Sequence, residues 1–260
     1  MRRSLEKPEE LAYQMTASTT VKRRRRPAYQ TSPLVYRIMK WIFSGLVRAI
    51  YRYQAIGQEN LPSDGSVIVA VNHLHLVDPP AVMLAVPRKV VTLVANKWRS
   101  SPIISRILRL AGVVFVRRGE VDRQALRDCF DHLANGGVLA LAPEGTRSRT
   151  GGLQRAKAGA AYLASRSKAP IVPVAVWGTE RLSDWARLKR PTCKVVVGRP
   201  FRLPEFSRRA STEELQHLAD LIMIRLGLLL PASYRGVYSE RCAAVERGES
   251  TELSVLLQTP

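Results

Sequence analysis

Residues 67–85 read VIVAVNHLHLVDPPAVMLA, and this stretch decides the fold class. It begins as a short β-branched apolar run, typical of a strand buried on both faces of a parallel sheet. The run leads into a polar turn with Asn72, His73 and Asp78, and an apolar segment resumes after two prolines. Aspartate before proline favours a helix start, so Asp78 is predicted to be an N-cap. The stretch therefore predicts a strand, a polar turn and a helix.

Further apolar runs follow at regular intervals, and helical stretches lie between them. Helical periodicity is clearest over residues 122–135, which end at two glycines. It recurs over residues 212–230, with Ser211 or Thr212 as N-cap and acids in the first turn. Alternating strands and helices predict an α/β fold with a largely parallel central sheet flanked by helices. The predicted strands are residues 67–71, 90–95, 113–116, 138–142, 171–176 and 194–197.

The chain before this domain is basic and changes character at residue 31. Residues 1–30 contain few large apolar side chains and a run of one lysine and four arginines, which predicts a disordered tail without a signal peptide. Over residues 34–53 polar side chains recur every three or four positions, as on an amphipathic helix. Its cations and Trp41 fit a helix lying among membrane headgroups, and the same pattern fits a helix packed on the core.

These changes in composition divide the 260 residues into four segments. A basic tail (1–30) precedes an amphipathic, membrane-associating helix (31–56). The α/β domain follows (57–231), since 46% hydrophobic content suffices for one sizeable core. Residues 232–260 contain few large apolar side chains before position 253 and are predicted to be a loosely attached tail.

The net charge of +20 and the pI of about 10.7 indicate an anionic partner. Nucleic acid, an acidic membrane surface and a phosphorylated substrate all fit that charge. A nucleic-acid-binding module with residues 23–26 as its arm is one alternative. No reader motif is present and aromatic residues make up 7%, so no nucleic acid is expected. The three cysteines show neither metal-ligand nor disulfide spacing, which indicates reduced cysteines in a cytoplasmic protein.

The chemistry-bearing residues lie where predicted strands end. In open α/β sheets ligands bind beyond the carboxyl ends of the strands. A turn from His73 to Asp78 can bring the carboxylate to one ring nitrogen and leave the other as a general base. Such a pair lacks the serine of a hydrolytic triad, so the base would act on a hydroxyl of the substrate. Considered separately, each residue has another interpretation: His73 as a structural histidine, and Asp78 as a helix start.

The fourth predicted strand runs into APEGTRSR, residues 142–149. Backbone N–H groups, a hydroxyl and a guanidinium in one tight turn make a phosphate cradle. Arg118, at the end of another strand, would add a second planar donor for the same anion. A surface loop with a solvated arginine is the alternative reading. No cluster of Asp, Glu and His side chains indicates a metal.

Together these residues resemble the phospholipid and glycerol-phosphate acyltransferases, specifically the bacterial 1-acyl-sn-glycerol-3-phosphate acyltransferase type. Four blocks appear in the family's order. NHLHLVD resembles the Asn-His-x4-Asp block, and GVVFVRR resembles Gly-x-x-Phe-x-x-Arg. PEGTRS and IVPVAVWGT resemble the Glu-Gly-Thr-Arg block and the block with a buried proline. The resemblance covers roughly residues 34–230.

The resemblance implies an enzyme in which His73 is the general base and Asp78 its partner. It would transfer a fatty acyl group from acyl-CoA or acyl carrier protein to 1-acyl-sn-glycerol-3-phosphate, giving phosphatidic acid, or to another lysolipid. It would need no cofactor or metal and would act peripherally on the anionic cytoplasmic face of the cell membrane. The implied acceptor-binding residues are Arg118, Glu144, Gly145, Thr146 and Arg147, and Pro173 is implied to support the acyl-donor side. Asn72 and Lys97, which also follow predicted strands, are predicted to have supporting roles.

Overall fold

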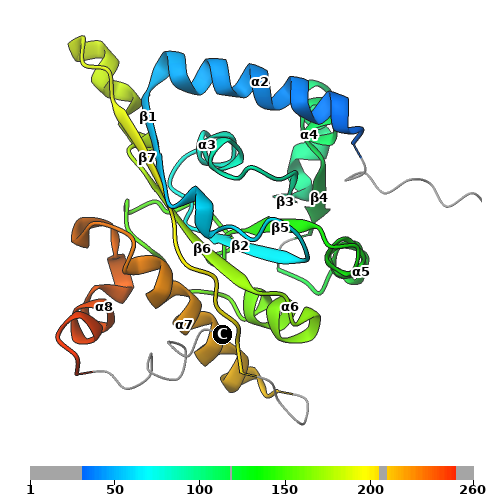
Figure 1. Ribbon diagram of the computed structural model, residues 1–260, viewed down its shortest axis with the longest axis vertical. Helices are drawn as coiled ribbons and strands as arrows, with labels where there is room; N and C mark the ends of the chain where they lie inside the picture. Colours follow the sequence, from blue (N-terminus) through cyan, green and yellow to red (C-terminus); the bar gives the residue numbers. More distant parts are fainter. Residues whose placement is uncertain (1–30, 118, 205–209, 250–260) are drawn as a thin grey trace, which may run out of the picture.

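The computed structural model describes residues 31–117, 119–204 and 210–249. Within them a seven-stranded sheet has the order β1-β7-β6-β2-β5-β3-β4 (Figure 1). All six predicted strands are present, with bounds that differ by two residues or fewer, and the α/β fold is confirmed. The strands are β1 Arg52–Ile56, β2 Val67–Val71, β3 Val90–Ala95, β4 Val113–Val116, β5 Val138–Leu141, β6 Ile171–Trp177 and β7 Thr192–Val197.

Strand β1 was missed by the sequence analysis, which assigned residues 31–56 to one helical segment. The helix α2 spans Pro33–Ile50, and Tyr51 is its extended C-cap. The strand that follows is short and alternates between exposed and half-buried side chains at the edge of the sheet. Arg52, the first residue of this strand, lies four positions after Arg48, so it continues the polar period of α2 by coincidence and hides the boundary.

Two strands run against the other five. β6 pairs antiparallel with β7, whereas β7 and β1 pair parallel with each other. The remaining pairs, β2 with β5 and β6 and β3 with β4 and β5, are parallel. The start of β1, and with it the C-terminal end of α2, therefore lies at the same edge of the sheet as the carboxyl ends of β2 and β6.

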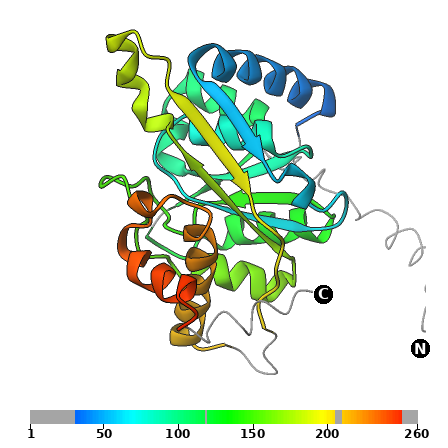
Figure 2. The ribbon, with the colours of Figure 1, turned by 60° about the vertical axis from the view of Figure 1, so that its left-hand side comes forward.

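Helices cover both faces of the sheet, and side chains of β2 alternate between two cores. On one face α2 packs with α3 (Asp78–Ala85) and α4 (Pro102–Ala111), and Tyr36, Met83 and Ala111 join these three helices. The other face carries α5 (Arg123–Ala134), α6 (Gly159–Ser167) and α7 (Thr212–Gly227) (Figures 1 and 2). The two predicted helices are present as α5, capped by Asp122, and α7, whose Ser211 forms a capping box with Glu214.

Residues 232–249 are part of the fold, which corrects the prediction of a loosely attached tail from residue 232. They form η4 (Ala232–Tyr234), η5 (Gly236–Tyr238) and α8 (Ser239–Glu246). Tyr238 is 3% exposed, and its hydroxyl donates to Asp220 at 2.6 Å and accepts from the Ala156 N–H at 2.9 Å. The scarcity of large apolar residues predicted a loose tail, whereas a few buried polar contacts fix this segment to the fold. Residues 250–260 lie outside the described residues.

Helix α2 has two different faces. Tyr36 and Val47 are buried against the core, whereas Leu34, Ile38 and Trp41 are 65%, 49% and 78% exposed. Packing on the core therefore occupies one face and leaves an apolar stripe on the other. Across the described part of the chain, no helix combines the length and the apolar character that crossing a bilayer requires. The predicted tail of residues 1–30 lies outside the described residues.

Candidate active site

The turn after β2 begins with a buried amide. Asn72 is 1% exposed, and its side chain accepts from the Val176 N–H at 2.8 Å and donates to the Val176 carbonyl at 2.7 Å. This pair of hydrogen bonds satisfies the polar atoms of the amide and fixes the end of β2 against β6. The residue predicted to have a supporting role therefore sets the point from which His73 leaves the sheet.

His73 and Asp78 lie in contact, as the spacing predicted. Nδ1 of His73 is 2.9 Å from Oδ2 of Asp78, and the side chains are 18% and 2% exposed. The main-chain N–H groups of Leu74 and His75 also donate to Oδ2, each at 2.6 Å. Because Oδ2 is already an acceptor for two N–H groups, we assign the proton of the neutral ring to Nδ1. The lone pair is then on Nε2.

Asp78 is not the N-cap that the sequence predicted. Helix α3 has Val77 as N-cap, and Asp78 is its first residue. The carboxylate points back to the turn, where its donors are His73 and the N–H groups of Leu74 and His75. A capping aspartate would instead accept from N–H groups two or three residues ahead in the helix. The side chain is thus committed to the histidine rather than to the helix.

The other carboxylate oxygen has a partner from a distant part of the chain. The hydroxyl of Thr179, which is fully buried, donates to Oδ1 of Asp78 at 2.5 Å. The Tyr51 hydroxyl donates to the Thr179 carbonyl at 2.8 Å, and burial raises the pKa of Tyr51 to about 12. The contacts connect the end of α2 to the His73–Asp78 pair through the turn after β6. Neither residue was predicted from the sequence, although Thr179 ends the motif IVPVAVWGT.

The loop after β5 is joined to the histidine turn by its backbone. The Ser148 N–H donates to the His73 carbonyl at 2.7 Å. The N–H of the same residue donates to Oε1 of Glu144 at 3.1 Å. The two sequence blocks that were predicted to share a site are therefore adjacent in the structure.

Glu144 lies inside this junction. It is 2% exposed, and its second oxygen accepts from the Gln154 N–H at 2.9 Å. Burial raises the pKa of Glu144 to about 7, because the desolvation of the charged form outweighs the two backbone hydrogen bonds that favour it. The resemblance implied contact with the acceptor, whereas here the carboxylate binds two loops of the protein.

The rest of this loop faces solvent. Thr146 and Arg147 are exposed, and Gly145 has φ 69°, a left-handed conformation that favours glycine. A Cβ at Gly145 would lie 3.0 Å from Cδ of Lys157, whose chain crosses the loop. The structure therefore places two exposed cationic side chains, Arg147 and Lys157, on the loop that begins beside His73.

The remaining predicted residues occupy separate positions. Lys97 is exposed in η2 (Asn96–Ser100), where its ammonium lies 5.5 Å from the Trp98 ring centre. Pro173 is buried in β6 opposite Ala70 of β2. Arg118 lies outside the described residues. Across the described ranges, no group of three or more His, Cys, Asp and Glu side chains is placed to hold a metal.

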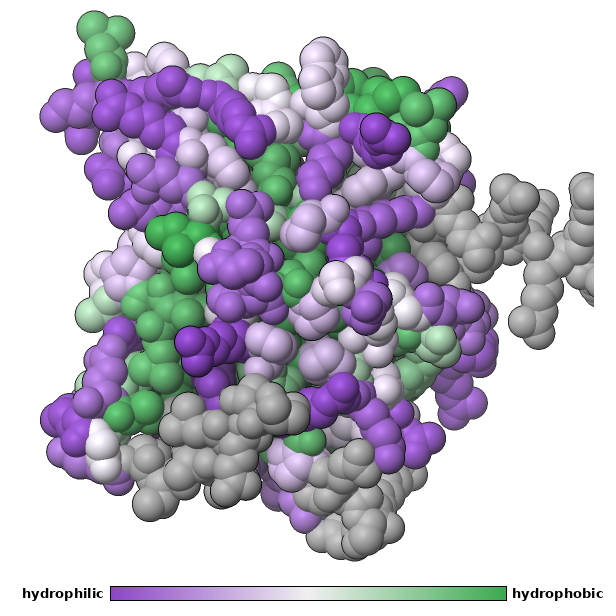
Figure 3. Space-filling view, viewed as in Figure 1, coloured by the Kyte–Doolittle hydropathy of each residue, from purple (hydrophilic) through white to green (hydrophobic). Residues whose placement is uncertain are grey.

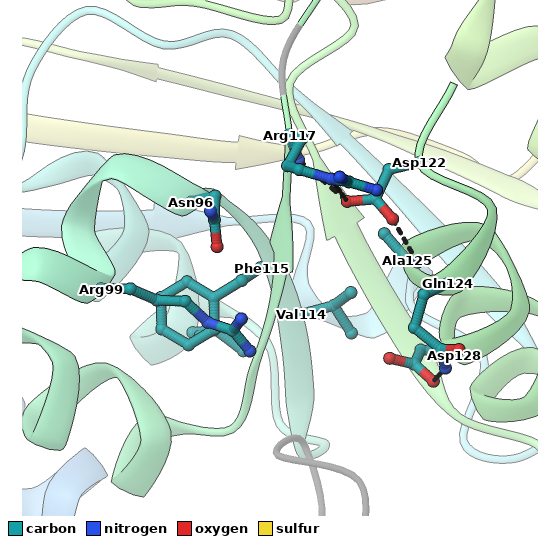
Figure 4. Close-up of a pocket in the computed structure, with 10 residues that line it drawn as sticks. Asn96, Arg99, Val114, Phe115, Arg117, Asp122, Gln124, Ala125 and Asp128 are labelled. Carbon is teal, nitrogen blue, oxygen red and sulfur yellow. Dashed lines mark hydrogen bonds and ion pairs between the residues drawn. The ribbon is translucent and has the colours of Figure 1, made fainter. Parts of the chain in front are cut away.

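A cavity of about 390 Å³ lies along the edge strand β4 (Figure 4). On one side the guanidinium of Arg99 stacks over Phe115, 4.9 Å from the ring centre. On the other side Arg117 binds Asp122, the N-cap of α5. Neither His73 nor Asp78 lines this cavity. It borders the β4–α5 loop and is separate from the histidine turn.

Comparison with known proteins defines the class. Residues 52–177 match the family model described as acyltransferase. The matched range begins at β1 and ends with β6, so it contains the His73–Asp78 pair and the Glu144 loop.

Two relatives with the same printed name illustrate the similarity. The chain is similar to the 1-acyl-sn-glycerol-3-phosphate acyltransferase of Borreliella burgdorferi, with 28% identity over 47% of this chain and 50% of that protein. For the Bacillus subtilis protein of the same name, identity is 26% over 65% of this chain and 83% of the relative. The chain spans about half the length of the first relatives it matches.

A solved structure shares the fold. It is the crystal structure of the 1-acyl-sn-glycerophosphate (LPA) acyltransferase PlsC from Thermotoga maritima, which matches with a TM-score of 0.58 and 25% sequence identity. The match covers 72% of this chain and 76% of that one.

Proposed function

We propose that this protein transfers a fatty acyl group from an acyl thioester to the free hydroxyl of 1-acyl-sn-glycerol-3-phosphate, giving phosphatidic acid. The observation that carries the proposal is the contact between Nδ1 of His73 and Asp78, which leaves the lone pair of Nε2 for a substrate proton. Relatives named 1-acyl-sn-glycerol-3-phosphate acyltransferase supply the substrate class. The donor is acyl-CoA or acyl carrier protein, and the reaction needs no further cofactor.

In the proposed reaction Nε2 of His73 removes the proton from the acceptor hydroxyl. The oxygen attacks the thioester carbonyl, and a tetrahedral intermediate forms with its negative charge on the former carbonyl oxygen. That intermediate collapses, the C–S bond breaks, and the thiolate takes the proton from the imidazolium. Asp78 stabilises the imidazolium formed in between, because its carboxylate is fixed by other donors at the required distance.

The acceptor's phosphate is proposed to bind the exposed part of the loop after β5. Arg147 can donate two parallel hydrogen bonds to phosphate oxygens, and Thr146 adds a hydroxyl. Glu144 has a different part in the proposal: its two backbone contacts maintain the geometry between this loop and the His73 turn. The phosphate-binding loop and the base are thereby held next to each other through Glu144.

The experiment is a transfer assay with purified protein and radiolabelled acyl donor. Acyl-CoA and acyl carrier protein are each tested against lysophosphatidic acid and a panel of lysolipids with other headgroups. The proposal expects labelled phosphatidic acid as the main product. If only a neutral lysolipid gave labelled product, that lysolipid would replace lysophosphatidic acid as the proposed acceptor. Absence of transfer with every pair would overturn the assigned activity.

The acceptor and product are lipids, so we also propose that the protein docks on the cytoplasmic face of the membrane. The exposed apolar stripe of α2 is flanked by Arg37 and Arg48, and α2 contains no acidic residue. Replacing Leu34, Ile38 and Trp41 by serine should release the protein from anionic vesicles without unfolding it, since none of them is buried. Vesicle sedimentation checks binding, and circular dichroism checks the fold. Retention of the triple variant on vesicles at high salt would assign docking to another surface.

A further inference from the structure

A short arm leaves the sheet after β6 and begins with Thr179, the residue that binds Asp78. It is η3, which spans Thr179–Arg187 and is followed by Leu188. Figures 1 and 2 both show this arm projecting past the sheet beside the C-terminal end of α2. Three large apolar side chains on it face solvent: Leu182, Trp185 and Leu188 are 40%, 44% and 94% exposed.

The spacing of Leu182 and Trp185 puts these two side chains on one side of the arm. In a 3₁₀-helix, side chains three positions apart eclipse each other. Leu182 and Trp185 follow the kink at Arg181 with that spacing, and Leu188 continues it as the C-cap. Figure 3 shows apolar surface at the outer end of the arm, next to strongly hydrophilic surface. The arm therefore presents an apolar edge rather than isolated apolar residues.

Leu188 also has a backbone conformation that is uncommon for leucine. Its φ is 56°, in the left-handed region that glycine or asparagine usually occupies. At this position the structure neither buries the side chain nor relieves the backbone. Leu188 thus combines an exposed apolar side chain with a strained backbone at the tip of a projecting arm. This combination points to a contact with something outside the folded chain.

The charges beside the apolar edge are positive. Three exposed cations lie on either side of Leu188: Arg187, Lys189 and Arg190. The two acidic residues of the arm are engaged elsewhere: Asp184 pairs with Arg181 at 3.1 Å, and Glu180 accepts from the Gly178 N–H and the Tyr234 hydroxyl. Exposed apolar side chains bordered by cations are complementary to the interface of an anionic bilayer.

The arm is fixed to the surface already proposed to meet the membrane. Nε1 of Trp185 donates to the Ile50 carbonyl at 3.0 Å, and Arg190 donates to the carbonyls of Arg48 and Tyr51. At its base, Thr179 donates to Asp78. The arm and the residues after it therefore contact the C-terminal end of α2, and the base of the arm contacts the His73–Asp78 pair.

We propose that this arm inserts Leu182, Trp185 and Leu188 into the headgroup region of an anionic phospholipid bilayer. This inference rests on the proposed function, because a lipid acceptor requires the site to meet the bilayer. The additional claim is that the arm, which begins beside Asp78, makes the contact with lipid. Docking through the arm would then place the His73 turn next to the bilayer. The stripe of α2 and the tip of the arm then form two separate points of attachment.

Vesicles of phosphatidylcholine and phosphatidylglycerol, without substrate, test the inference. The double variant Leu182→Ser/Leu188→Ser should bind them at least about tenfold more weakly than the wild type, since burial of each leucine favours binding by that order. Val237→Ser is the matched control, because Val237 is 67% exposed on η5. It should bind like the wild type.

A second measurement locates the tip directly. The chain already contains four tryptophans, so quenching by brominated phospholipids is compared with that of the wild type. The added indole of Leu188→Trp should contribute quenched fluorescence, whereas the added indole of Val237→Trp should contribute unquenched fluorescence. Unchanged binding of the double variant, or equal quenching at both positions, would overturn the inference. So would sedimentation velocity showing that Leu188 joins two copies of the chain. Because no acyl transfer is measured, failure of the proposed activity and failure of the arm's role are read separately.

Discussion

The hydroxyl of Thr179 donates a hydrogen bond to Oδ1 of Asp78 across 2.5 Å, although 101 positions separate the two residues. Thr179→Val should therefore lower kcat about tenfold to a hundredfold, as expected when a carboxylate loses a hydrogen bond worth roughly 1.5–3 kcal/mol. The KM for both substrates should change little, because Thr179 is buried behind Asp78. Steady-state kinetics measures both constants. Thr179→Ser keeps the hydroxyl and should restore most of kcat; equal losses in both variants would indicate a packing role.

Replacing His73 should have a larger effect. His73→Ala removes the proposed base and should reduce turnover roughly a hundredfold to ten-thousandfold while leaving thermal stability nearly unchanged. His75→Ser is the comparison, since its main-chain N–H still donates to Asp78 and only its side chain changes. Acyl transfer by the His75 variant should stay near the wild-type rate. If the two variants were equally inactive, the assignment of the base would fail.

Arg147 is expected to act on the acceptor alone. Arg147→Ala should raise the KM for lysophosphatidic acid about tenfold to a hundredfold, because it removes charge-assisted contacts to phosphate. The KM for the acyl donor should stay constant. Arg149→Ala is a matched control, since it removes an exposed arginine two positions further along the loop. A rise in donor KM with unchanged acceptor KM would reverse the assignment of the two substrates.

The sequence alone predicted the parts of this site that depend on local order. The strand, the turn and the distance from His73 to Asp78 follow from residues 67–78 alone, because an apolar run of this kind forms a strand and a tight turn leaves few conformations. Thr179 and Tyr51 could not be found in this way. Their contacts depend on β6 and α2 ending at the same edge of the sheet, which is set by the pairing of strands far apart in the chain.

The acid at the loop junction was misjudged for a related reason. A glutamate in PEGTRS looks available to a substrate, and only the packing of two loops shows that Glu144 is 2% exposed. Similarly, residues 232–249 seemed to lack a core because Tyr238 and Cys242 are single buried residues in short helical turns. Local composition does not report contacts made by one side chain at a time.

Glu144 should make stability depend on pH. Its pKa rises from 4.5 to about 7 on folding. Between these values the unfolded chain has lost the proton that the folded chain keeps, so the free energy of unfolding should fall as pH rises from about 4.5 to 7, by roughly 3 kcal/mol in total. Urea unfolding at half-unit pH steps measures this slope. In Glu144→Gln the slope should be smaller, and an unchanged slope would assign it to another group.

Tyr238 should contribute to stability through its hydroxyl. Tyr238→Phe removes the donor to Asp220 and the acceptor for Ala156, and should lower the free energy of unfolding by about 1–3 kcal/mol. Tyr162→Phe is a control that deletes a hydroxyl from α6, and it should cost less. Chemical denaturation compares the two variants. Equal stabilities of the two variants would show that the two hydrogen bonds of the Tyr238 hydroxyl contribute little.

The hydrogen bonds of Leu153 have a consequence for the order in which the protein is made. Its N–H donates to the Tyr234 carbonyl at 2.9 Å, and its carbonyl accepts from Val237 at 3.1 Å. These bonds hold the far end of the loop that starts beside His73. During translation this loop therefore lacks two of its hydrogen bonds until residue 237 has left the ribosome. Synthesis of more than eighty further residues thus separates the appearance of Leu153 from the completion of its contacts.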